Sequence, residues 1–209
     1  MKQFFTIFSL FISLFSFSQK IALDHSVYDQ WESIRESIWQ PQGKFICYSI
    51  NPQEGDAVLI VKNIVSKIEI IIPRGAQPVF TEDGNYLIAK IKPTFNETRK
   101  AKIDKKKPDE MPKDSLVILV LATGKMNKIS GVKSFQVPEF GNGLMAYLKE
   151  SKGDFNKEGS QLYFRDLSSG QERIFNNISQ YLIHPKGEGV MMYQVRTKQK
   201  EAKIFLFIN

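Results

Sequence analysis

Phe80-Thr81-Glu82-Asp83-Gly84-Asn85-Tyr86 is the stretch of sequence that decides the predicted fold. An apolar segment leads into Asp83-Gly84, and an apolar–aromatic segment follows it. Asp-Gly readily adopts the positive φ angles of tight hairpins, so the stretch predicts two antiparallel strands joined by a short turn. A third and a fourth strand are predicted at Ser115–Leu121 and Met126–Ile129, on either side of Thr123-Gly124.

The same order of strands and turns occurs in four copies along the chain. Their first turns lie at Gly43, Gly84, Gly141-Asn142-Gly143 and Gly187. Gly43 and Gly84 are 41 positions apart, and Gly143 and Gly187 are 44 apart. The spacing from Gly84 to Gly143 is 59, and a Lys/Pro-rich insertion at 93–113 accounts for the excess. A period of about 40–45 residues with four strands per unit is typical of β-propeller blades.

The predicted fold is therefore all-β, a partial β-propeller of about three and a half four-stranded blades over residues 38–209. The last copy reaches its final strand at Lys203–Ile208, where the sequence stops. A β-sandwich remains an alternative because it also consists of short strands with turns between them. It does not explain why four copies keep the same internal order.

The first eighteen residues have the layout of a secretory signal peptide. Lys2 supplies the positive charge, Phe4–Phe17 is apolar, and Ser16-Phe17-Ser18 offers small residues for cleavage before Gln19. As a helix, the apolar stretch spans only about 21 Å, less than the ~30 Å hydrocarbon core of a bilayer, which disfavours an uncleaved anchor. We expect an exported protein, periplasmic or extracellular, with no stable membrane insertion after cleavage.

Residues 19–37 are predicted to form an N-terminal extension with one short helix, roughly Ser26 to Glu36. Ser26 and Asp29 have the spacing of a capping box. The apolar face of this helix is assigned to Val27, Trp31 and Ile34.

The formal charge of +7 is concentrated in one segment of the chain. Residues 99–107 hold six cationic residues and one Asp, and the rest of the chain is close to neutral once Lys2 is removed. No basic stripe extends over several elements, so nucleic acid is not an expected partner. We interpret the insertion as a solvated, charged loop, with contact to another domain or an acidic surface as the alternative.

The sequence predicts no catalytic, cofactor-binding or metal-binding residues. Cys47 is the only cysteine and lies in a predicted strand, which favours a small buried side chain over a reactive thiol. The two histidines, His25 and His184, belong to distant parts of the chain. Two His and one Cys do not make a metal cluster, and no cofactor is expected.

Two segments of the chain resemble a known family of enzymes. Leu23–Asp29 with Trp31, followed by Tyr48–Asp56, looks like the start of bacterial exported peptidases of the prolyl oligopeptidase family. The insertion, with Arg99-Lys100-Ala101-Lys102 and Asp109–Ser115, is similar to one in the second blade of such proteins. The resemblance implies an N-terminal β-propeller that caps an α/β-hydrolase domain and restricts the access of peptides.

The resemblance also implies that the catalytic triad lies in the hydrolase part. A Gly-x-Ser-x-Gly nucleophile elbow does not occur in these 209 residues, so no family catalytic residue is carried over. The expected function is the substrate-gating propeller portion of an exported serine peptidase, inactive alone, which meets peptide substrates together with a missing hydrolase domain. The alternatives are a standalone exported propeller that binds a protein or glycan, and a decayed remnant.

Overall fold

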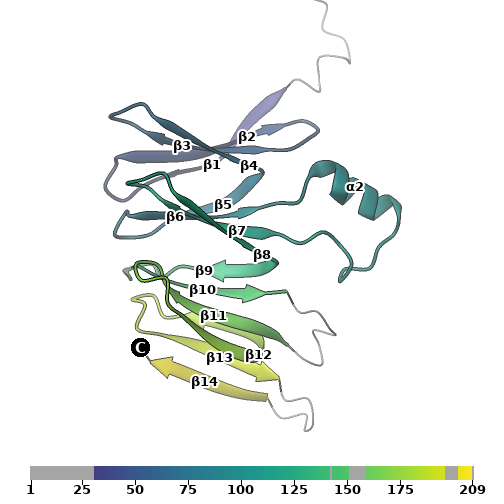
Figure 1. Ribbon diagram of the computed structural model, residues 1–209, viewed down its shortest axis with the longest axis vertical. Helices are drawn as coiled ribbons and strands as arrows, with labels where there is room; N and C mark the ends of the chain where they lie inside the picture. Colours follow the sequence, from purple (N-terminus) through teal and green to yellow (C-terminus); the bar gives the residue numbers. More distant parts are fainter. Residues whose placement is uncertain (1–30, 142, 151–158, 196–201, 209) are drawn as a thin grey trace, which may run out of the picture. The chain divides into compact units, whose positions relative to one another are not determined.

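The computed structural model describes residues 31–141, 143–150, 159–195 and 202–208. In this part of the chain there are fourteen strands and one helix, and all the strand pairs are antiparallel (Figure 1). The predicted signal peptide, His25 and the first five residues of the predicted N-terminal helix lie outside these ranges. None of the helices in the described part is long and apolar enough to cross a membrane.

The strands form three sheets in which neighbours in space are neighbours in sequence. The first sheet consists of β1 (Glu32–Trp39), β2 (Phe45–Pro52), β3 (Val58–Asn63) and β4 (Glu69–Pro73). The second consists of β5 (Gly75–Phe80), β6 (Tyr86–Ile91), β7 (Ser115–Val120) and β8 (Met126–Ser130). The third consists of β9 (Val132–Gln136), β10 (Leu144–Lys149), β11 (Ser160–Asp166), β12 (Glu172–Ile183), β13 (Gly189–Val195) and β14 (Ala202–Ile208).

The predicted glycine turns at Gly43, Gly84 and Gly187 are confirmed, and each has the same type of backbone hydrogen bond. Gly43, Gly84 and Gly187 have φ angles of 70°, 65° and 73°. In each case the glycine N–H donates to the carbonyl oxygen three residues earlier, at 2.9, 2.9 and 2.8 Å. Because the same turn recurs at the same place in the strand order, the chain is built from structural repeats, as the sequence period predicts.

The third and fourth predicted units differ from the expected separate blades because one strand belongs to both. The sequence predicts a short strand at Glu172–Phe175, and this segment is instead the first part of the twelve-residue β12. This strand pairs with β11 up to Ile178 and with β13 from Ile178 onward. A left-handed residue, Asn177, with φ 62°, and a register shift between Ile178 and Gln180 change its direction without ending it.

The predicted helix from Ser26 to Glu36 is wrong at its C-terminal end, because β1 begins at Glu32. Pairing of β1 with β2 on both sides of a register shift between Arg35 and Ile38 outweighs the helical spacing of its apolar residues. Ile34 and Trp39 remain 69% and 63% exposed, and cross-strand pairing puts them on the same face of the sheet as Ile71, which is 55% exposed.

The insertion at 93–113 was predicted to be a loop and instead contains α2 (Phe95–Ile103), which extends from the β6–β7 connection (Figure 1). Thr94 accepts a hydrogen bond from the Glu97 N–H, and the Glu97 carboxylate accepts one from the Thr94 N–H. This capping box satisfies N–H groups that the first turn of a helix leaves without partners. The lysines of the segment remain exposed: Lys100, Lys102, Lys105, Lys106 and Lys107.

The core lies between the sheets rather than on one side of each. Along β6, Leu87 and Ala89 belong to a cluster with the first sheet, whereas Ile88 belongs to a cluster with the third. A strand that buries alternate residues on opposite faces lies in a sheet covered on both sides. Sheets stacked face to face in chain order, each made of an antiparallel meander, are the packing of propeller blades. The all-β, β-propeller prediction is confirmed.

Candidate functional site

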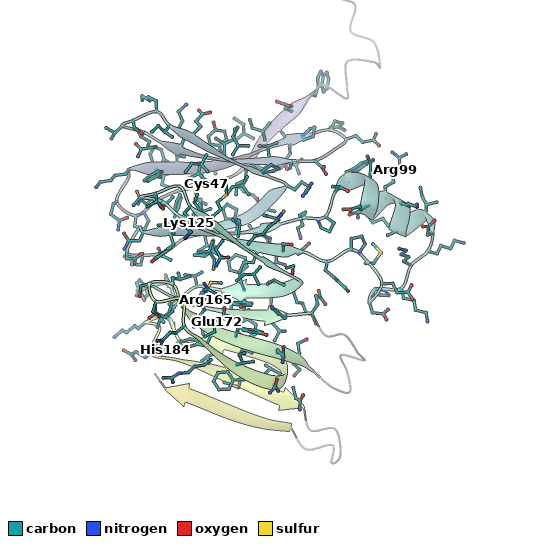
Figure 2. All side chains as sticks on the ribbon, viewed as in Figure 1. Cys47, Arg99, Lys125, Arg165, Glu172 and His184 are labelled. Atoms are coloured by element: carbon teal, nitrogen blue, oxygen red, sulfur yellow. The ribbon has the colours of Figure 1, made fainter. Side chains whose placement is uncertain are left out.

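Cys47, the single cysteine, is fully buried between the first and second sheets (Figure 2). Burial, with a smaller contribution from the Glu36 carboxylate, raises the pKa of its thiol to about 12. A thiol with this pKa is not a thiolate near neutral pH and is therefore not nucleophilic. The predicted role of a small buried side chain is confirmed.

We expect the raised pKa of Cys47 to make the protein less stable as pH rises. The pKa is 9.0 for an unperturbed thiol and about 12 in the folded protein. The unfolded state therefore loses its proton first, and stability falls as pH rises above 9. Denaturant unfolding of the wild type and Cys47→Ala at about pH 7 and about pH 10 measures this contribution.

The Cys47→Ala variant keeps every tyrosine and so corrects for their ionisation over the same pH range. The stability advantage of the wild type over this variant should shrink at the higher pH. An advantage that is independent of pH would show that Cys47 has no raised pKa.

His184 is an exposed residue at the turn after β12 (Figure 2). Its Nδ1 accepts a hydrogen bond from the Lys186 N–H at 3.3 Å, and lies 3.7 Å from Glu188 Oε2. These contacts belong to the turn itself. Among the residues that the structure describes, no three His, Cys, Asp or Glu side chains are grouped so that they could hold a metal ion.

A polar network joins three strands of the third sheet. The Glu172 carboxylate accepts a hydrogen bond from the Tyr147 hydroxyl at 2.7 Å and forms an ion pair with Arg165 at 2.6 Å (Figure 2). Tyr147 stacks on Tyr163 with ring centroids 4.9 Å apart. Burial and the bond to Glu172 raise the pKa of Tyr147 well above its usual value. A tyrosine that holds its proton so firmly serves packing rather than acid–base chemistry.

A hollow of about 300 Å³ lies where the first and second sheets meet. It is bordered by β1 at Arg35 and Glu36, by Asn51 and the turn after β2, by the β4–β5 connection at Arg74, and by Lys92 at the end of β6. Pockets of this volume are at the lower end of the range for small-molecule sites. It is the candidate binding site of the molecule.

Backbone strain occurs at two of the residues that line the hollow. Glu36 and Arg74 have φ angles of 51° and 59°. Such left-handed conformations cost non-glycine residues about 1 kcal/mol or more and are concentrated at functional sites. Each is held by a bond between the sheets: Glu36 Oε2 accepts from the Gln77 N–H at 3.1 Å, and the Arg74 carbonyl oxygen accepts from the Lys92 N–H at 2.9 Å.

The carboxylates of the hollow are bonded to backbone groups, whereas its arginines are not bonded to carboxylates. Asp56 Oδ1 accepts from the Phe95 N–H at 2.6 Å, and Lys92 is paired with Asp114 at 2.8 Å. Arg74 Nε donates to the Lys92 carbonyl at 3.0 Å. Within the described ranges neither Arg35 nor Arg74 forms an ion pair.

No motif in the sequence marks Arg35 or Arg74 as binding residues. They lie 39 positions apart, on the first strand and on the connection to the second sheet, and only the stacking of the sheets brings them to one hollow. The one local signal is the Arg74-Gly75 step after Pro73, which marks a sharp connection but not a binding residue.

The fold makes the chain a β-propeller protein, and solved propellers are similar to it. The acylaminoacyl peptidase of Pyrococcus horikoshii aligns with a TM-score of 0.55 and 9% identity, over 90% of this chain and 33% of that one. The β-propeller domain of the trilobed protease from Pyrococcus furiosus, described as having an open velcro topology, aligns with a TM-score of 0.54 and 11% identity, over 86% and 55%. A eukaryotic initiation factor aligns with a TM-score of 0.51 and 17% identity, over 85% and 41%.

Two of these three structures come from peptidases of the prolyl oligopeptidase family, the family that the sequence resembles. The chain spans about a third to a half of the length of these structures. At such low identity the likeness establishes the fold alone. No family model and no curated protein matches the chain.

Proposed function

We propose that the chain is the substrate-gating propeller portion of an exported serine peptidase of the prolyl oligopeptidase family, and that the reaction itself belongs to an α/β-hydrolase domain. The observation that carries the proposal is the agreement between the sequence resemblance and the fold. The stacked antiparallel sheets align with structures of two peptidases of that family over 86–90% of the chain.

The placement of the insertion supports the same proposal. The resemblance locates a Lys-rich insertion in the second blade, and the structure has it between β6 and β7 of the second sheet. There α2 is attached to the first sheet by the Arg99–Glu54 ion pair at 2.6 Å (Figure 2). An insertion in the connection between two strands of one blade leaves the stacked faces free to pack, so the propeller can carry it without loss of its core.

The proposal is tested on the protein as the cell makes it. An antibody against residues 93–113 should detect, in the exported fraction, a protein longer than 209 residues that a fluorophosphonate probe labels. The probe reacts with an activated serine, which the hydrolase domain would supply. The transcript should continue in frame beyond Asn209 to a Gly-x-Ser-x-Gly elbow.

A second candidate is a standalone exported propeller that binds a protein or a glycan. The similarity to a eukaryotic initiation factor supports this second candidate, because a similar arrangement of strands also occurs outside peptidases. An exported protein of 209 residues or fewer that the fluorophosphonate probe does not label would contradict the peptidase proposal and favour this candidate.

A further inference from the structure

We propose that the hollow between the first and second sheets is a binding site for the C-terminal carboxylate of a short peptide, with Arg35 and Arg74 as the groups that recognise it. The choice of a peptide over other carboxylic acids rests on the proposed function. The recognition of a carboxylate rests on the charges and contacts of the hollow itself.

Two arginine side chains of the hollow are available to bind a carboxylate. Arg74 uses Nε for the Lys92 carbonyl, which fixes the direction of its side chain and leaves the two terminal nitrogens of the guanidinium for a ligand. Arg35 lines the same hollow, and in the described part of the chain its side chain makes no ion pair. A guanidinium binds a carboxylate through two parallel hydrogen bonds, a geometry that a lysine does not offer.

The other charges of the hollow favour a ligand with a single negative charge. Lys92 shares the Asp114 carboxylate with Lys90, at 2.8 and 3.2 Å, so its charge is partly balanced, and Glu36 and Asp56 add two carboxylates to the lining of the hollow. Arg74 also lowers the pKa of Glu97, although less than the hydrogen bonds from Thr94 do, so its charge is partly balanced. A phosphate with two negative charges would meet these carboxylates at close range, and a carboxylate suffers less repulsion.

The acceptor groups indicate what is attached to the carboxylate. Glu36, Asn51 and Asp56 line the hollow and have side chains that contain acceptor oxygens, and peptide N–H groups are donors that such oxygens bind. A volume of about 300 Å³ suits two or three residues of peptide rather than a longer segment. A cationic end and an acceptor-lined wall together match a short peptide held by its C-terminus.

The experiment compares two forms of one peptide on the full-length protein. N-acetyl-Ala-Ala with a free carboxylate and the same peptide with a C-terminal amide are titrated calorimetrically, with acetate and inorganic phosphate as further arms. We expect the free acid to bind about tenfold or more tightly than the amide, because the amide lacks the charge-assisted pair of bonds. Acetate should bind more weakly than the peptide acid, because it has no N–H group for the acceptors.

Three variants separate recognition from folding. Arg74→Gln should weaken binding of the peptide acid about tenfold. Arg74→Lys should recover little of the lost affinity, because an ammonium group cannot form the two parallel hydrogen bonds of a guanidinium. Lys128→Gln removes an exposed cation on β8, outside the hollow, and should leave the affinity unchanged. Thermal unfolding of each variant checks that the fold is kept.

Equal affinity for the peptide acid and amide, tighter binding of phosphate than of the peptide acid, or no binding of the peptide acid would each overturn the inference. So would an equal loss of affinity in Arg74→Gln and Lys128→Gln. None of these results bears on the length of the native protein or its reaction with a fluorophosphonate. Failure of this site and failure of the peptidase proposal are therefore distinguishable.

Discussion

Leu87→Ala is expected to lower the free energy of unfolding by about 2–5 kcal/mol. Leu87 is 0% exposed and lies on β6, in the cluster that packs the first sheet against the second. Its removal takes away buried apolar surface and leaves a cavity between two sheets whose backbones are fixed by their own ladders. Urea unfolding followed by circular dichroism measures the change.

Leu182→Ala is the matched control for this substitution. Leu182 is also a leucine on a strand, but it is 56% exposed on β12. We expect its replacement to change stability by no more than about 0.5 kcal/mol. Similar losses for both variants would contradict the packing between the first and second sheets.

Gly159→Ala is expected to lower the free energy of unfolding by about 3 kcal/mol or more, because a buried clash is added to backbone strain. Gly159 has a φ angle of 66°, and a Cβ atom at this position would lie 2.6 Å from the backbone carbon of Asn177. Since the neighbour is backbone on β12, a rotamer change cannot relieve the contact. Denaturant unfolding again gives the magnitude.

Gly131→Ala tests the same conformation without the close approach. Gly131 has a φ angle of 68°, and nothing lies within 4 Å of the position its Cβ atom would take. We expect a loss of about 1–2 kcal/mol, the cost of a left-handed conformation alone. If both glycine variants lost the same free energy, the approach of residue 159 to β12 would not be as the structure has it.

The strand order of the fold could be predicted because its signal is local and repeated. Each tight turn needs a glycine with positive φ, so Gly43, Gly84 and Gly187 mark the same place in successive units. Even the insertion at 93–113 could be located, because it lengthens one spacing and leaves the others unchanged.

The secondary structure of two segments differs from the prediction, for a different reason in each. At the start of β1 the helical spacing of Trp31 and Ile34 predicts a helix, whereas pairing with β2 makes the segment a strand. In the insertion, the charge and the prolines concealed a capping box at Thr94 and Glu97, a pattern that is readable in the sequence. The sequence has the same spacing at Ser26 and Asp29, which lie outside the described residues.

The candidate site could not be predicted because nothing local marks it. Arg35 and Arg74 are ordinary surface-type residues in the sequence, and their significance comes from the hollow they share. Their left-handed and bulged surroundings are also invisible in the sequence, because Glu36 and Arg74 are not residues that favour positive φ. A site formed between sheets depends on packing, which single-sequence patterns do not encode.

The sequential order of strands in every sheet has a consequence for how the chain folds. In the described ranges each strand pairs with the strand made just before it, so every ladder joins strands that are consecutive in the sequence. Folding rates of β proteins fall as the sequence separation of contacts grows, and a meander keeps that separation small. Each sheet can therefore form as soon as its last strand leaves the ribosome. The β6–β7 pair must close the loop containing α2, so we expect it to form more slowly than the other pairs of the second sheet.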